Sequence, residues 1–289
     1  MMKPDFAVTK ERVKLYWPLI KPLQTGLLLA TGLAGYMSAR CPVFHLGTLL
    51  AVGGSLFLAI SGSTVLNMWW DRDIDAKMPR TQKRPLAAGN LSSHETFMLG
   101  MILSFLGVGW AFGLDSLYGW IVLAGWFFDV VVYTIWLKRR TCWSILWGGI
   151  SGGMPVLAGR TLGVGHMDVI GVLLAVAVLF WIPTHIMTFS LRHFEDYQAA
   201  GIPTFPERYG FKTTRLIISI STLLATLAIT VVGILLGITW GYLRLLAVLS
   251  VGLLILALVA VFRPSERIHF SLYKYASLYM LSAMLLLAL

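Results

Sequence analysis

Three oxygen-bearing side chains recur at four-residue intervals where an apolar segment ends: Asn67, Asp71 and Asp75. On a helix each step of four residues rotates by about 40°, so the three side chains point along one face. Such hard oxygen ligands suit Mg²⁺, which binds one or two carboxylates together with substrate phosphates. Asp73 lies about 200° around the same helix and is the poorer candidate. The spacing indicates a magnesium site, although a solvated loop rich in acids and bases would have a similar composition.

Cations follow the last of these acids closely. Arg80, Lys83 and Arg84 lie within nine residues of Asp75. A bound diphosphate needs a metal on some of its oxygens and cations on the others, because both kinds of charge offset its own. The cations therefore favour a diphosphate site over a solvated loop, and we expect Arg80 and Arg84 to hold the diphosphate.

Two further segments carry charge at the ends of apolar stretches. Glu195 and Asp196 form a second oxygen pair that could face the first cluster across a cavity, although such pairs are usually just solvated. Lys138 and Arg139 end another stretch, where cations also serve to orient membrane proteins. Tyr133 lies one and a half turns before Lys138, and its ring either packs in the bilayer or faces a developing carbocation.

Two ionisable residues fall inside apolar stretches, where such groups are rare and are treated as functional hypotheses. Asp129 lies one turn before Tyr133 and shares its predicted face. His185 precedes Asp196 by eleven residues and could contact a polar substrate group or ligate iron. A hydrogen bond between packed helices would explain either residue equally well.

The elements that must position these residues are membrane helices. Of the 289 residues, 57% are hydrophobic and only 12% are charged, against about 25% charged in soluble domains. A bilayer crossing needs roughly 20 apolar residues in a helix. We therefore predict one all-α, polytopic transmembrane domain over residues 1–289. It has nine spans, at about 16–37, 44–66, 97–114, 118–137, 144–162, 168–190, 215–239, 243–262 and 270–289.

The positive charges predict how this bundle is oriented. With a cytoplasmic N-terminus, all of the 23 Lys and Arg residues except Arg40, Arg160 and Arg244 fall on the cytoplasmic side. Orientation in a prokaryotic plasma membrane, rather than nucleic-acid binding, then accounts for the net charge of +10. The C-terminus is expected outside, and no cleavable signal is expected at the N-terminus. Cys41 and Cys142 are expected on opposite faces, unbridged.

The pattern from Asn67 to Asp75 resembles the first signature of the UbiA-type intramembrane prenyltransferases. Within that superfamily, the sequence resembles the branch that farnesylates haem. The resemblance rests on four runs: DRDIDAKMPRTQKRPL (71–86), YTIWLKRRT (133–141), GGISGGMPVLAG (148–159) and EDYQAAGIP (195–203). Other branches carry a second Asp-x-x-x-Asp motif, where this chain has His193 and Tyr197.

The resemblance implies a Mg²⁺-dependent transfer from farnesyl diphosphate to a vinyl group of haem B, giving haem O. It assigns the metal to Asn67, Asp71, Asp75 and Asp196, with Glu195 a weaker candidate, and the diphosphate to Arg80, Arg84, Lys138 and Arg139. Tyr133 would stabilise the cation and His185 would contact haem.

Partners would be the lipid bilayer and other proteins of haem biosynthesis or oxidase assembly, and not nucleic acid. The alternatives are prenylation of a quinone precursor, chlorophyllide or an archaeal glycerol lipid. A transporter is more remote, because polar sites of transporters lie near the midplane and only Asp129 is deep here.

Overall fold

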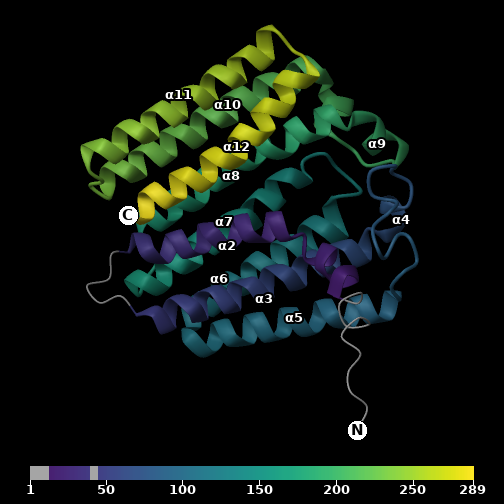
Figure 1. Cartoon of the computed structure of the whole chain (residues 1–289), viewed down its shortest axis with the longest axis horizontal. Helices are drawn as coiled ribbons and strands as arrows, with labels where there is room; N and C mark the ends of the chain where they lie inside the picture. Colours follow the sequence, from purple (N-terminus) through teal and green to yellow (C-terminus); the bar gives the residue numbers. More distant parts are fainter. Residues whose placement is uncertain (1–12, 40–44) are drawn as a thin grey trace.

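The computed structural model describes residues 13–39 and 45–289, and every regular element in this part of the chain is helical (Figure 1). The long helices run roughly parallel or antiparallel in one bundle. In chain order the elements are η1 (Trp17–Ile20), α2 (Pro22–Ser38), α3 (Leu46–Trp70), α4 (Arg72–Asp75), α5 (Ser93–Leu114), α6 (Ser116–Phe127), η2 (Phe128–Leu137), α7 (Ser144–Val164), α8 (Val169–Arg192), α9 (Phe194–Ala199), α10 (Phe205–Leu235), α11 (Trp240–Phe262) and α12 (Glu266–Ala288).

Seven of the described helices are long and apolar enough to cross a bilayer: α3, α5, α6 with η2, α8, α10, α11 and α12. The other two expected spans correspond to α2 and α7, which lie within the same bundle. The all-helical membrane fold is therefore confirmed, whereas nine crossings and the orientation of the termini stay predictions. Arg40 and Cys41 lie outside the described residues, as do the cations before Val13, and Cys142 is a buried free cysteine.

The expected span at 16–37 is wrong at its beginning, because the chain breaks at Lys21. Lys21 adopts left-handed φ/ψ angles of 45° and 66°, and it separates η1 from α2. The cause is local: a proline disfavours helical angles at the residue before it, and Pro22 directly follows.

Glycines bring the bundle's central helices close together. A Cβ atom on Gly159 of α7 would lie 2.0 Å from the carbonyl oxygen of Gly32 on α2. One on Gly35 would lie 2.2 Å from the carbonyl oxygen of Val156. Small residues allow such backbone contact in membrane helices, where packing rather than water drives association. The close approach fixes α2 against α7, and both helices contribute to the cavity described below.

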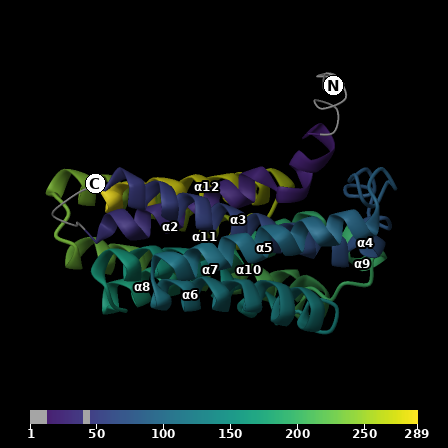
Figure 2. The ribbon, with the colours of Figure 1, turned by 90° about the horizontal axis from the view of Figure 1, so that it is seen from below.

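The two charged segments meet at one end of the bundle. Short helices α4 and α9 lie beside each other at the end opposite the C-terminus in both views (Figures 1 and 2). Ile74 and Met78 from the first segment pack with Ala200 and Ile202 from the second in a small buried cluster. The fold thus brings together two polar segments that are more than a hundred residues apart in sequence.

Candidate active site

A cavity of about 750 Å³ opens among α2, α3, η2, α7, α8 and α12. Its polar lining gathers at the α4 end, whereas Leu, Ile, Met and Trp side chains line much of the remainder. This volume lies within the range of roughly 300 to 1,000 Å³ that small-molecule sites occupy. The charged residues of the lining are Lys21, Asp71, Asp75, Arg80, Arg84, Asp129 and Lys138.

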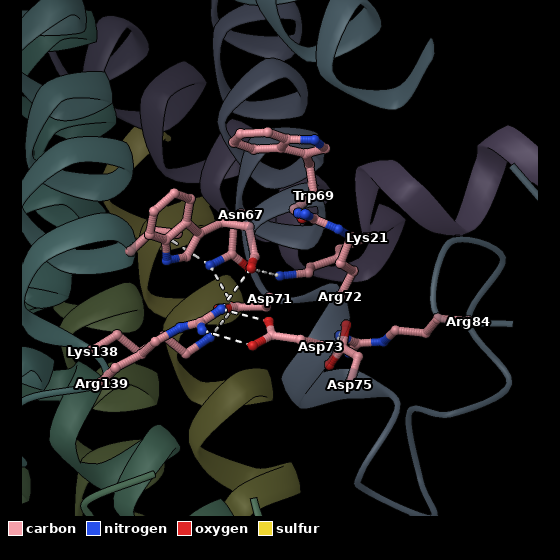
Figure 3. Close-up of polar contacts among 12 residues, drawn as sticks. Lys21, Asn67, Trp69, Asp71, Arg72, Asp73, Asp75, Arg84, Lys138 and Arg139 are labelled. Atoms are coloured by element: carbon pink, nitrogen blue, oxygen red, sulfur yellow. Dashed lines mark hydrogen bonds and ion pairs between the residues drawn. The ribbon is translucent and has the colours of Figure 1, made fainter. Parts of the chain in front are cut away.

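Asn67, Asp71 and Asp75 are all buried and all line this cavity. Helix α3 ends at Trp70, and Asp71 caps it before the single turn of α4 ends at Asp75. The Asp75 amide donates to the Asp71 carbonyl oxygen over 2.8 Å, which keeps the two acids on one side despite the break. The Asn67 amide nitrogen donates to Asp71 Oδ2 over 3.2 Å (Figure 3). It also donates to Thr134 Oγ1 over 3.0 Å.

One carboxylate oxygen in the cluster of Asn67, Asp71 and Asp75 is a candidate ligand for a metal ion. Asp71 Oδ1 is buried and has no hydrogen-bond partner within residues 13–39 and 45–289, and its nearest cation, Arg139 Nη2, lies at 3.9 Å. A buried carboxylate oxygen without a donor is stabilised when a cation approaches more closely. Within the described residues, no three His, Cys, Asp or Glu side chains are grouped closely enough to bind a metal ion. Mg²⁺, however, commonly binds only one or two carboxylates together with substrate phosphates. The donor set therefore fits Mg²⁺ bound together with a phosphate ligand.

Cations engage the three side chains from separate elements, as Figure 3 shows. Lys138, just after η2, forms an ion pair with Asp71 Oδ2. Arg84 Nη1 lies 2.9 Å from Asp75 Oδ1 and 2.7 Å from its Oδ2. Lys21 donates to Asn67 Oδ1. Sequence reasoning missed Lys21 because it was counted inside a continuous span, although the Pro18 and Pro22 spacing signals the break.

Arg139 is not among the residues that line the cavity, and its assignment to the diphosphate stays a prediction. Its guanidinium binds both oxygens of Asp73, over 2.8 Å and 2.7 Å, and the Trp70 carbonyl oxygen over 2.6 Å. The side chains of Arg139 and Asp73 are 32% and 57% exposed. Hydrogen bonds from Arg139 hold the pKa of the Asp73 carboxyl below its usual value. The pair thus fastens α4 to the end of η2, beside the cavity.

Asp196 and Glu195 do not join the first acidic cluster directly. Asp196 Oδ2 lies 3.7 Å from Arg80 Nε and 3.6 Å from His193 Nδ1, and Asp196 is not among the residues that line the cavity. Glu195 is exposed. The structure therefore connects Asp196 to the cavity through Arg80, which does line it.

Tyr133 and Asp129 line the cavity from η2, the π-helix that continues α6. The Lys138 amide donates to the Tyr133 carbonyl oxygen over 2.8 Å, a five-residue step typical of a π-helix, which is frequent at functional sites. Lys138 Nζ also lies 5.7 Å from the centre of the Tyr133 ring. A Cβ atom on Gly148 would approach that ring to 3.3 Å, so the glycine leaves room for it.

His185 lines the deeper part of the cavity among aromatic side chains. The rings of Trp181 and Tyr273 stack on its imidazole, with centroids at 4.9 Å and 4.4 Å. Ser277 Oγ lies 3.1 Å from its Nδ1. Tyr273 and Ser277 belong to α12, a segment that the sequence identified only by its hydropathy.

The sequence profile of the UbiA prenyltransferase family matches residues 28–280. The chain belongs to the UbiA prenyltransferase family. Its relatives include several proteins named protoheme IX farnesyltransferase. That of Archaeoglobus fulgidus is 44% identical over 70% of this chain and 71% of its own length. That of Pyrobaculum islandicum is 36% identical over 91% of this chain and 94% of its own.

Solved structures of UbiA-type proteins share the fold. A digeranylgeranylglyceryl phosphate synthase has a TM-score of 0.78 and 20% identity, covering 96% of this chain and 98% of that one. A UbiA homologue from Archaeoglobus fulgidus bound to GPP and Mg²⁺ has a TM-score of 0.69 and 16% identity, covering 95% and 100%. At these identities the likeness concerns the arrangement of the helices, and the predicted resemblance to the family is confirmed by the match over 28–280.

Proposed function

We propose that this membrane protein transfers the farnesyl group of farnesyl diphosphate to a vinyl group of haem B, giving haem O and diphosphate. The observation that best supports this proposal is the buried cluster of Asn67, Asp71 and Asp75 at one end of a largely apolar cavity. Several cations line the same end of the cavity. Relatives named protoheme IX farnesyltransferase, at 36–44% identity, support haem as the acceptor. The reaction would serve haem maturation for terminal oxidases in a prokaryotic plasma membrane.

The polar end would bind the diphosphate and assist its departure. Asp71 and Asp75, with Asn67, would hold Mg²⁺, which supplies Lewis-acid stabilisation of the charge that develops on the leaving oxygens. Lys138, Arg84 and Arg80 line the same end and would donate to the remaining phosphate oxygens. Asp71 and Asp75 hold Lys138 and Arg84 at this end of the cavity, so these cations would be close to the leaving oxygens on which negative charge develops.

The apolar part would protect the carbocation. When the allylic C–O bond breaks, both electrons leave with the diphosphate and a farnesyl cation remains. Tyr133 lines the cavity beside the polar end, and its ring face would stabilise a nearby cation. The surrounding apolar side chains exclude water, which would otherwise capture the cation before the acceptor does.

The acceptor would lie deeper, near His185. The π electrons of a haem vinyl group attack the farnesyl cation and form a carbon–carbon bond. The positive charge moves to the carbon next to the macrocycle, where a water molecule adds and releases a proton. The product is the hydroxyethylfarnesyl group of haem O. His185, stacked between aromatic neighbours of α8 and α12, would orient the macrocycle.

The test is incubation of the purified full-length protein with Mg²⁺, farnesyl diphosphate and haem B, followed by mass spectrometry of the haem. We expect farnesylated, hydrated haem, and none of it when Mg²⁺ is chelated. A parallel reaction offers 4-hydroxybenzoate as a quinone precursor. Prenylation of that acceptor, with haem left unchanged, would overturn the haem assignment and favour another branch of the family.

A further inference from the structure

Two kinds of contact position the His185 imidazole: aromatic stacking on its ring and a polar contact at its Nδ1 edge. Trp181 stacks on the imidazole at an interplanar angle of 24° and Tyr273 at 26°. Trp181 is itself fixed, because its Nε1 donates to the Ala276 carbonyl oxygen over 2.8 Å. Stacking fixes the plane of the imidazole, so its polar contacts must be made through the two nitrogens at its edge.

The Nδ1 edge faces Ser277 Oγ, at 3.1 Å. The Ser277 hydroxyl has a second neighbour, the carbonyl oxygen of Tyr273 one helical turn before it, at 3.2 Å. A carbonyl oxygen can only accept a hydrogen bond, whereas a hydroxyl group has a single proton to donate. When the Ser277 proton goes to the Tyr273 carbonyl oxygen, Ser277 Oγ is left to accept from His185 Nδ1–H.

This arrangement selects one tautomer of the neutral imidazole. With the proton on Nδ1, the other nitrogen, Nε2, keeps its lone pair. Nε2 has no hydrogen-bond partner within the described residues, and His185 lines the cavity together with Ser277 and Tyr273. Histidines that ligate metals almost always donate their other ring N–H to an oxygen acceptor, which fixes the tautomer and raises the basicity of the ligand.

We propose that Ser277 is a positioning residue that holds His185 as the Nδ1–H tautomer, so that His185 Nε2 ligates the haem iron. The proposal rests on the function proposed above. It gives α12 a role in acceptor recognition, and it adds an oriented iron ligand to a pocket that would otherwise hold the macrocycle by apolar contact alone. Ser277 acts through His185 and does not itself touch the reacting vinyl group.

The experiment titrates the purified full-length protein with ferric haem B, followed by absorption and electron paramagnetic resonance spectra. The wild type should show an axial histidine signature, and His185→Ala should lose it. Ser277→Ala should weaken haem binding about tenfold and shift the spectrum, because the tautomer is no longer fixed. Ser277→Thr keeps the hydroxyl and should restore both. Ser219→Ala is the matched control, since Ser219 donates to the Ala257 carbonyl oxygen between helices and does not line the cavity.

The outcomes separate this proposal from the proposed function. A Ser277→Ala protein with wild-type haem affinity and spectrum would overturn the role of Ser277. A wild type that farnesylates haem without an axial histidine signature would overturn iron ligation and leave the function intact. A wild type that neither binds nor converts haem would refute both. Equal losses in Ser277→Ala and Ser219→Ala would indicate a general packing defect and would also count against the positioning role.

Discussion

Asp71 and Asp73 stand two residues apart in opposite surroundings, and their isosteric asparagine variants should behave very differently. Asp71 is 3% exposed, lines the cavity and pairs with Lys138. The Asp73 side chain is 57% exposed and pairs with Arg139 beside the cavity. Each substitution removes one negative charge at nearly constant volume. Any difference between the two variants therefore reports position rather than the overall charge of the segment.

The expected magnitudes follow from these surroundings. Deleting one preorganised group from a site that stabilises developing charge costs about 3 to 4 kcal/mol. At 1.36 kcal/mol per tenfold change, Asp71→Asn should lose turnover by a factor of roughly 10² to 10³. An exposed ion pair contributes at most about 1 kcal/mol, so Asp73→Asn should lose at most about fivefold. Asp71→Asn also leaves Lys138 without its counter-ion, and partial exposure of Lys138 should limit the destabilisation to about 1–2 kcal/mol.

The assay measures initial rates of haem farnesylation across a Mg²⁺ series in reconstituted membranes, with thermal unfolding of each variant recorded alongside. Asp71→Asn should need more Mg²⁺ as well as turning over slowly, whereas Asp73→Asn should keep the wild-type Mg²⁺ dependence. An Asp71→Asn protein with more than a tenth of wild-type turnover at low Mg²⁺ would refute the metal assignment. Equal losses in both variants would show that the charge of the segment matters rather than the geometry.

Other substitutions test the remaining parts of the site and the bundle. Lys21→Ala removes the donor to Asn67 Oδ1 and a cation from the cavity, so the KM for farnesyl diphosphate should rise several-fold with haem affinity unchanged, measured by separate titrations. Tyr133→Phe should stay near wild-type kcat, whereas Tyr133→Leu should lose roughly tenfold, because a cation–π contact contributes about 1–2 kcal/mol; equal rates would exclude the ring. Gly159→Ala should destabilise the protein by about 1–3 kcal/mol, because its Cβ would meet a backbone oxygen of Gly32 at 2.0 Å. Gly109→Ala has open space and should be neutral or slightly stabilising in the same unfolding measurement.

The sequence predicted most helix positions because an apolar run must satisfy its backbone inside itself in a bilayer. The observed ends of α3 and α8 differ from the expected spans by only a few residues, since hydropathy changes sharply there. The four-residue spacing of Asn67, Asp71 and Asp75 predicted that their side chains cluster, because local helix geometry alone sets the direction of side chains four residues apart. Its members do meet in the cavity, even though α3 ends before Asp71.

Side-chain partnerships across the bundle were beyond the sequence. The sequence did not predict that the Arg139 guanidinium donates two hydrogen bonds to Asp73. Ser277 and Tyr273 gave no signal, because a serine and a tyrosine in an apolar helix usually only pack, and their contact with His185 depends on how α12 docks on α8. Such partnerships arise from tertiary packing, which leaves no local spacing pattern in the chain.

The pairing of acids with cations at the polar end of the cavity bears on the kinetics of substrate capture. Asp71 and Asp75 already engage Lys138 and Arg84, so much of the charge at this end is compensated at short range. Attraction of an anionic diphosphate from a distance then depends strongly on the excess of +10 on the chain as a whole. Exposed charges are screened beyond about 8 Å at physiological ionic strength, whereas buried pairs are screened much less. Raising the salt concentration should therefore slow the encounter with the diphosphate while the rate of the bound complex changes little.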